Sequence, residues 1–249
     1  MAKKSLKFDT TGESVQNIST LSKKKFHPND LISITPANDR QKQFLEAFYS
    51  QTPMILMDGP AGTGKSFLAL YAAFSEVFQD GSPYRRVIVI RSAVEGRKIG
   101  FLPGSETEKA EPFEMPYKQI VQQIIKFKTA YNNLKALGYY EFHLSSHQRG
   151  TTYDNAIIIV DEVQNFDVSE VRTICTRVGT NSKLVLMGDL KQNDLARYRE
   201  KSCFNYLKSV MRLMPYDSTC HVHFKLEDIV RSGFVRDFLI ADSQVSDDE

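Results

Sequence analysis

The stretch DGPAGTGKSF, residues 58–67, decides the fold of this chain. It contains the pattern G-x-x-x-x-G-K-[ST], filled by Gly59, Gly64, Lys65 and Ser66. A short apolar run precedes the pattern, and apolar residues at helical spacing follow it. In such a segment a strand ends, a glycine-rich loop wraps a phosphate chain with its backbone N–H groups, and a helix begins with its positive end toward the anion. A glycine turn that matches by chance is the alternative, and the flanking strand and helix patterns argue against it.

The residue types of this loop predict the role of each position. Lys65 is expected to reach the β- and γ-phosphates, and the Ser66 hydroxyl is expected to ligate Mg²⁺. The predicted nucleotide-binding residues of the loop are Gly59, Pro60, Ala61, Gly62, Thr63, Gly64, Lys65, Ser66 and Phe67.

The composition excludes several classes of protein. Of the 249 residues, 41% are hydrophobic and 25% are charged, as is usual for a globular chain. The net charge of +2 means that any nucleic-acid site must be a local patch. No apolar run approaches the ~20 residues of a membrane span, and no secretory signal is visible. Three scattered cysteines and five histidines without metal-ligand spacing predict a cytoplasmic protein with reduced thiols and no metal bound by these residues.

Strand and helix patterns alternate along most of the chain, which predicts a three-layer α/β fold with a central parallel sheet. We expect residues 1–30 to be weakly structured, residues 31–241 to form one domain, and residues 242–249 to be an acidic tail. The segment 93–116 is expected to be irregular. Strands are predicted at 54–58, 85–92, 156–162, 183–189 and 220–225, and helices at 38–50, 65–79, 117–137, 169–179, 203–214 and 227–241.

The acidic pair Asp161 and Glu162 directly follows the apolar strand AIIIV. Ligands of open parallel sheets bind at the carboxyl ends of the strands, so this pair is expected beside the phosphate loop. Asp161 is predicted to hold Mg²⁺, and Glu162 is predicted to act as the general base for the attacking water. Two surface acids after a core strand would look the same in isolation, but the phosphate loop favours the catalytic interpretation.

Two glutamines and three arginines are further candidates. Gln192 follows the strand KLVLMGD, where a glutamine can contact the γ-phosphate or the water, although a polar turn residue fits equally well. Gln41 could read the adenine edge through its amide, or could be a solvated helix residue. An arginine is expected to stabilise the transferring phosphoryl group, and the candidates are Arg149, Arg177 and Arg231.

Several blocks resemble the PhoH-like ATPases: GPAGTGKS, RSAVEGRKIGFLPGSETEKAEP, RGTTYDNAIIIVDEVQN, TRVGTNSKLVLMGDLKQNDL and DIVRS. The resemblance spans roughly residues 35–240, and the family is similar to the nucleotide-binding core of superfamily 1 helicases. It implies Mg²⁺-dependent ATP hydrolysis, with Gln192 at the γ-phosphate, Gln41 near the base and Arg91 facing nucleic acid. It also implies a homo-oligomer, with a hexameric ring as the suggested form. Some members carry a PIN ribonuclease domain, and we expect none here.

This chain departs from the family pattern at two places. It has Arg91–Ser92 where the family has Arg-Pro, and Arg149–Gly150–Thr151–Thr152 where the family has R-G-R-T. The second departure removes an arginine that could contact phosphate or RNA.

The sequence therefore predicts an ATPase coupled to single-stranded nucleic acid, RNA before DNA. A small-molecule kinase and a non-hydrolysing nucleotide switch are the alternatives. The candidate nucleic-acid contact consists of three cations and an aromatic ring within eleven residues: Arg91, Arg97, Lys98 and Phe101. Equally, Phe101 could belong to the core and the cations could be solvated.

Overall fold

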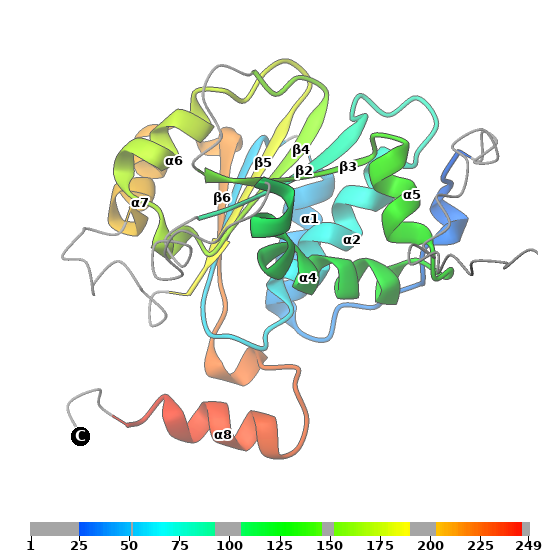
Figure 1. The fold of residues 1–249 in the computed structure, drawn as a ribbon. Coiled ribbons are helices and arrows are strands. Elements are labelled where there is room, and N and C mark those ends of the chain that lie inside the picture. Colours follow the sequence, from blue (N-terminus) through cyan, green and yellow to red (C-terminus); the bar gives the residue numbers. More distant parts are fainter. Residues whose placement is uncertain (1–24, 51, 93–105, 146–151, 190–202, 246–249) are drawn as a thin grey trace, which may run out of the picture.

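The computed structural model describes residues 25–50, 52–92, 106–145, 152–189 and 203–245. Within them, one six-stranded sheet has the order β3-β2-β4-β5-β1-β6, and every adjacent pair of strands is parallel (Figure 1). The predicted parallel sheet is thus confirmed. The strands are β1 (Met54–Asp58), β2 (Arg86–Arg91), β3 (Tyr140–Leu144), β4 (Ala156–Asp161), β5 (Lys183–Gly188) and β6 (Thr219–His223).

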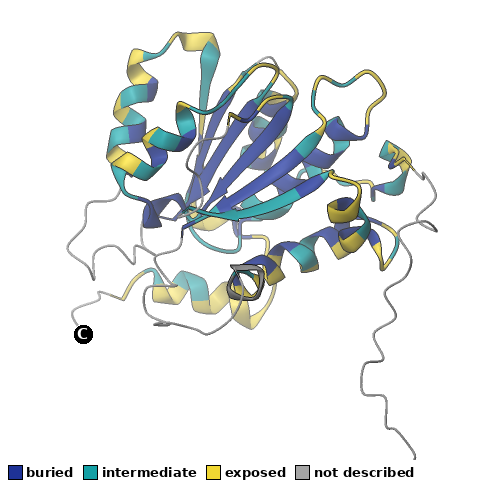
Figure 2. Cartoon of the chain, turned by 45° about the horizontal axis from the view of Figure 1, so that its top comes forward, coloured by how far each residue is buried: buried dark blue, intermediate teal, exposed yellow. Residues whose placement is uncertain are grey.

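Helices cover both faces of the sheet, which confirms the three-layer α/β architecture. One core layer joins the sheet to α1 (Asp39–Tyr49), α2 (Lys65–Val77), α4 (Glu106–Ile124) and α5 (Ala130–Ala136). The other joins it to α6 (Val168–Cys175) and α7 (Phe204–Leu213). Successive strand residues alternate between the two layers, so the central strands β1, β4 and β5 are buried along their whole length (Figure 2).

The last helix, α8 (Phe234–Asp242), has no buried residue and lies apart from the two layers (Figure 1). The sequence predicted one helix over 227–241. The structure instead has a 3-10 helix at Leu226–Asp228, an extended segment, and then α8 after Gly233, whose φ of 58° lies in the left-handed region. Glycine adopts this conformation without the Cβ clash that other residues meet, and it separates the two helical pieces.

Helix α4 differs most from the sequence prediction. It begins at Glu106, inside the segment that was expected to be irregular, and it contains Pro112 and Pro116. Prolines in a helix interior remove hydrogen bonds and disfavour a helix. Its apolar residues nevertheless recur at helical spacing and are buried, and this packing outweighs the local preference. The buried apolar residues of α4 are Phe113, Tyr117, Val121 and Ile124.

The predicted helix over 117–137 is in fact two helices, because the chain turns between α4 and α5. The N-terminal segment contacts the chain at this turn, where the Ile32 N–H donates to the Ile124 carbonyl at 2.8 Å. Residues 25–30, which were expected to be weakly structured, are part of the packed domain. The Phe26 ring is 3% exposed and stacks on Phe78 at 5.0 Å. Strand β3 was not predicted, since its sequence YEFHL alternates over only five residues.

Candidate nucleotide site

The predicted phosphate loop lies between β1 and α2, at the edge of the sheet where the parallel strands end. Gly59 has a φ of +135°, and a Cβ built there would lie 2.3 Å from the Phe224 carbonyl oxygen. Gly64 is the N-cap of α2 with a φ of 85°, and it provides no side-chain cap for the first turn of that helix. Glycine is therefore required at both positions, and the N-terminus of α2 presents backbone N–H groups that suit an anion.

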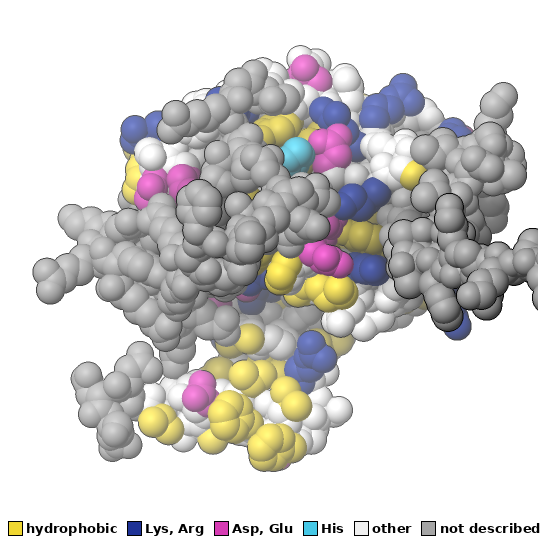
Figure 3. Space-filling model, viewed as in Figure 1, with side chains coloured by type: hydrophobic (Ala, Val, Ile, Leu, Met, Phe, Trp, Pro, Cys, Tyr) yellow, Lys and Arg dark blue, Asp and Glu magenta, His cyan; other side chains and the backbone are white. Residues whose placement is uncertain are grey.

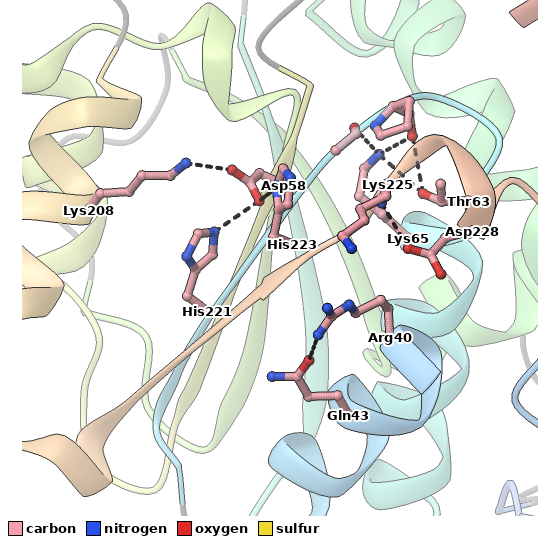
Figure 4. Close-up of polar contacts among 12 residues, drawn as sticks. Arg40, Gln43, Asp58, Thr63, Lys65, Lys208, His221, His223, Lys225 and Asp228 are labelled. Carbon is pink, nitrogen blue, oxygen red and sulfur yellow. Dashed lines mark hydrogen bonds and ion pairs between the residues drawn. The ribbon is translucent and has the colours of Figure 1, made fainter. Parts of the chain in front are cut away.

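Lys65, the first residue of α2, folds back over the loop. Its Nζ donates to the carbonyl oxygens of Gly59 at 2.7 Å and of Pro60 at 2.8 Å (Figure 4). Burial lowers the pKa of Lys65, while the carboxylates of Asp189 and Asp161 act in the opposite direction. An ammonium group held among loop carbonyls in a partly desolvated site is poised to bind phosphate oxygens.

Segments that are distant in the sequence hold the loop in place. The Gly59 N–H donates to Gly188 at the end of β5 at 3.3 Å, and the Val230 N–H donates to the Gly62 carbonyl at 3.0 Å. Gln41 forms a third brace, because its Nε2 donates to the Thr63 carbonyl at 3.1 Å. The Gln41 Oε1 accepts from the Ala37 N–H at 2.8 Å, so this buried amide already has a donor and an acceptor contact within the chain.

The acidic pair lies beside the loop, as the sequence predicted. The Ser66 hydroxyl donates to Asp161 Oδ2 at 3.0 Å, which joins the two halves of the predicted magnesium site. A hydroxyl and a carboxylate are hard oxygen ligands of the kind that Mg²⁺ takes together with substrate phosphates, so these residues fit the ion. Among the described residues no group of three or more His, Cys, Asp or Glu side chains could hold a metal ion by itself.

Glu162 follows Asp161 in the left-handed conformation, with a φ of 54°. Burial raises its pKa, and the charge of Asp161 adds to this effect. Its carboxylate accepts from Gln164 Nε2 at 2.5 Å and lies 4.0 Å from the Arg91 guanidinium, and both contacts favour the charged form. A non-glycine residue in this conformation is uncommon. Here the two contacts hold the Glu162 side chain in one orientation at the site.

Two residues of the site were not predicted from sequence. The hydroxyl of the buried Tyr117 donates to Asp161 Oδ2 at 2.8 Å, although nothing in the sequence distinguished Tyr117 from its neighbours in the predicted helix. Gln164 donates to Glu162 and also accepts from the Asp189 N–H at 3.0 Å. Its position three residues after Asp161 was the one available signal.

A cleft of about 750 Å³ opens over the loop. It brings together Gln41, Lys65, Asp161, Glu162 and Arg231, all of which were predicted from sequence. The cleft is lined further by Ile34, Thr35 and Ala37 before α1, by residues 61–64 and Ser66, Phe67 and Leu68, by Pro116, Gln119, Ile120 and Gln123 of α4, and by Gly188, Asp189 and Val230. Its volume is in the range of small-molecule and cofactor sites.

Arg177 does not lie at this site. The segment around it pairs with residues that precede β4, as in the hydrogen bond from the Tyr153 N–H to the Arg177 carbonyl at 2.8 Å. It therefore lies near the amino ends of the strands, at the opposite edge of the sheet from the phosphate loop, and cannot reach the phosphates of its own chain.

Arg91 ends β2 and points toward the acidic pair. Its guanidinium lies 4.0 Å from Glu162 and 5.8 Å from the centre of the Phe113 ring. The other predicted residues, Arg97, Lys98, Phe101, Arg149 and Gln192, lie outside the described residues.

A second polar cluster surrounds Asp58, the residue directly before the loop, whose side chain is 1% exposed. Its Oδ2 accepts from Lys208 Nζ at 2.7 Å, and its Oδ1 lies 2.9 Å from His221 Nε2 and 2.8 Å from His223 Nδ1 (Figure 4). Burial alone would raise the pKa of Asp58, but the hydrogen bonds from these three side chains outweigh it and hold the pKa well below its usual range. The cluster ties β1 to β6 and α7 at the start of the loop.

The family model described as PhoH-like protein matches residues 33–241. The chain belongs to the PhoH-like family. This result confirms the resemblance that the sequence blocks indicated, and it covers the phosphate loop, the acidic pair and Arg231. Together with the parallel sheet, membership supports a nucleotide-binding ATPase domain.

Relatives and solved structures give the extent of the similarity. A PhoH-like protein of Synechocystis sp. is 33% identical over 79% of this chain and 58% of its own length. Protein PhoH2 of Bacillus subtilis is 34% identical over 68% of this chain and 39% of its own length, and Protein PhoH of Escherichia coli is 31% identical over 82% and 56%. The chain thus spans about half the length of the curated relatives it matches.

Among solved structures, the chain is similar to the large terminase of a thermophilic bacteriophage in complex with ADP, with a TM-score of 0.49 and 13% identity over 84% of this chain and 50% of that one. It is also similar to the Pif1 helicase from Candida albicans, with a TM-score of 0.37 and 17% identity over 78% and 41%. Within the described part of the chain, no helix has the length and hydropathy needed to cross a bilayer.

Proposed function

We propose that this chain hydrolyses ATP with Mg²⁺ in the cleft over the phosphate loop, and that hydrolysis is coupled to single-stranded nucleic acid, with RNA as the first candidate. The observation that carries the proposal is the contact of Ser66 with Asp161 at 3.0 Å. The two predicted magnesium ligands therefore lie side by side near the N-terminus of α2, which has no side-chain cap. Glu162 is the residue after Asp161.

In this proposal each side chain of the site has one role. Lys65 exchanges its bonds to the Gly59 and Pro60 carbonyls for bonds to phosphate oxygens, while Ser66 and Asp161 hold Mg²⁺. When bound, Mg²⁺ would neutralise charge on the phosphate oxygens. Glu162 accepts the proton of the attacking water, and its desolvation makes the carboxylate a stronger base than one in solution.

Arg231 lines the cleft, and we propose that it stabilises charge on the transferring phosphoryl group. Gln192 remains a candidate for contact with the γ-phosphate. Arg177 could serve such a role only toward the site of a neighbouring copy, because it lies at the far edge of its own sheet.

Two substitutions test the hydrolysis. Lys65→Ala should abolish ATP turnover without unfolding the chain, with the exposed Lys128→Ala as its control. Glu162→Gln should retain ATP binding while kcat falls by roughly 10²–10⁴, the usual share of a general base, with the exposed Glu46→Gln as its control. Wild-type turnover in Lys65→Ala would contradict the site, and loss of binding in Glu162→Gln would make Glu162 a binding residue instead of a base.

The coupling to nucleic acid is tested by measuring phosphate release with and without poly-U and with a DNA strand of equal length. Stimulation by poly-U supports the proposal. Turnover that requires a small-molecule acceptor would support a kinase, and tight ATP binding without turnover would support a switch. Arg97→Ala combined with Lys98→Ala should weaken RNA binding and reduce its salt dependence, by about 0.7 in slope for each lost phosphate contact.

We also propose that the chain assembles into a homo-oligomer, with a hexameric ring as the form that the family resemblance suggests. The exposed apolar side chains of α8 support a contact surface: Phe234 is 80% exposed, Val235 49% and Phe238 55% (Figure 3). Sedimentation of the wild type and of Phe238→Ser gives the test, since a monomeric wild type would contradict the assembly.

A further inference from the structure

We infer that Tyr117 is a positioning residue for the magnesium-binding carboxylate of Asp161. This inference rests on the proposed function, because it concerns the metal that the proposed reaction requires. It adds a residue of α4 to a site otherwise made from the phosphate loop and the end of β4.

The contact itself is specific. The Tyr117 hydroxyl donates to Asp161 Oδ2 at 2.8 Å, and the Ser66 hydroxyl donates to the same oxygen at 3.0 Å. The other oxygen, Oδ1, accepts from the Glu162 N–H at 2.9 Å. The carboxylate is therefore held from α2, from α4 and by the backbone N–H of the next residue, and these three contacts fix its plane.

The Tyr117 hydroxyl has no role in packing. Tyr117 is 2% exposed, and its ring packs against Phe142 with the ring centres 5.7 Å apart. A phenylalanine would fill the same space without a buried polar group, and such a group is unfavourable unless it is hydrogen-bonded. The hydroxyl is therefore explained by its contact with Asp161.

Helix α4 links this contact to the rest of the cleft. Pro116, Gln119, Ile120 and Gln123 of the same helix line the cleft wall, so Tyr117 connects that wall to the metal-binding acid. One turn earlier, the Glu114 carboxylate accepts from the Tyr131 hydroxyl and from Lys135 Nζ, which fixes α4 to α5. The helix is thus fixed to α5 one turn before Tyr117, which limits the freedom of Asp161 to turn.

Tyr131 offers a matched control. Like Tyr117 it is a buried tyrosine whose hydroxyl donates to a carboxylate, but its partner Glu114 is not in the cleft. Tyr117→Phe and Tyr131→Phe each remove one buried hydroxyl of the same helix pair. If Tyr117 had only a structural role, the two variants would therefore show the same Mg²⁺ dependence and similar losses in melting temperature.

The experiment measures binding of a fluorescent ADP analogue to the full chain in Mg²⁺ and in EDTA, together with the Mg²⁺ concentration that gives half-maximal ATP turnover. Loss of a residue that orients a metal ligand typically reduces metal affinity by about 10–100-fold. Tyr117→Phe should therefore raise the half-maximal Mg²⁺ concentration by a factor in this range and lose the Mg²⁺-dependent part of its ADP affinity, with unchanged affinity in EDTA. Tyr131→Phe should keep the wild-type Mg²⁺ dependence.

The outcomes separate this inference from the proposed function. A wild-type chain whose nucleotide binding does not respond to Mg²⁺ would overturn both. A responsive wild type with an equally responsive Tyr117→Phe, or with equal shifts in Tyr117→Phe and Tyr131→Phe, would overturn the positioning role alone.

Discussion

Replacing Asp58 by Asn should destabilise the domain. The buried carboxylate of Asp58 accepts from Lys208, His221 and His223 at 2.7–2.9 Å. Asparagine keeps the shape, but it presents an NH₂ group to side chains that are themselves donors and removes the negative charge that Lys208 faces. At least one of the three contacts must therefore break.

The magnitude follows from the exposure of the three partners. A hydrogen bond to a charged group contributes about 1.5–3 kcal/mol. The side chains of Lys208, His221 and His223 are 27%, 36% and 59% exposed, so each can recover contacts with water. We therefore expect the free energy of unfolding to fall by about 2–3 kcal/mol. This is about the contribution of one such bond, and it is less than the cost of leaving a fully buried charge unpaired. For a chain of this size the melting temperature should fall by about 4–12 °C.

Urea unfolding at several pH values provides the assay, and the exposed Asp217→Asn is the control. Because the hydrogen bonds hold the pKa of Asp58 below that of the unfolded chain, its contribution is present at neutral pH and is lost as the pH falls. The difference between wild type and Asp58→Asn should be present at neutral pH and should shrink below about pH 4. Equal stability of Asp58→Asn and Asp217→Asn at neutral pH would refute this reasoning.

Two further substitutions test the braces of the loop. Gly64→Ala places a Cβ at a φ of +85°, and the control Gly81→Ala places one at +78° in open space, so both should lose about 1–2 kcal/mol of stability. Only Gly64→Ala should weaken ADP binding in a fluorescence titration. Equal ADP affinities of the two variants would contradict the role of the loop. Gln41→Ala removes the amide that joins Ala37 to Thr63 and should lower the melting temperature by a few degrees, for about 1–2 kcal/mol. If Gln41 instead serves only to read the base, the melting temperature without nucleotide should not change.

The parts of this structure that could be predicted from sequence are those that local patterns determine. The phosphate loop has its own glycine and lysine spacing, and the strand ending at Asp161 is a continuous apolar run followed by an acidic pair. Since parallel strands end at the same edge of the sheet, these two segments had to lie close together once the fold class was known. The contact between Ser66 and Asp161 follows from that argument.

The parts that could not be predicted depend on which strands are neighbours. Asp58 is the last residue of an apolar strand, and its partners are supplied by β6 and α7, whose place beside β1 has no local signal. Helix α4 was hidden by Pro112 and Pro116, because tertiary burial outweighed the proline signal. Without α4 in place, Tyr117 could not be connected to Asp161. Arg177 lies away from the cleft because it follows α6 and precedes β5, and in a parallel sheet such a helix-to-strand connection lies at the amino ends of the strands.

The position of β1 in the sheet has a consequence for biosynthesis. Of the six described strands, β1 is the first to leave the ribosome, yet its neighbours are β5 and β6, the last two of the six to be made. The phosphate loop that follows β1 is braced by Gly188, Phe224 and Val230, so its frame is incomplete until about residue 230 has emerged. During synthesis the apolar residues of β1 have no sheet partner, and an unpaired apolar strand is prone to aggregation. ATP cannot relieve this hazard by mass action, because a nucleotide stabilises only chains whose loop has already formed.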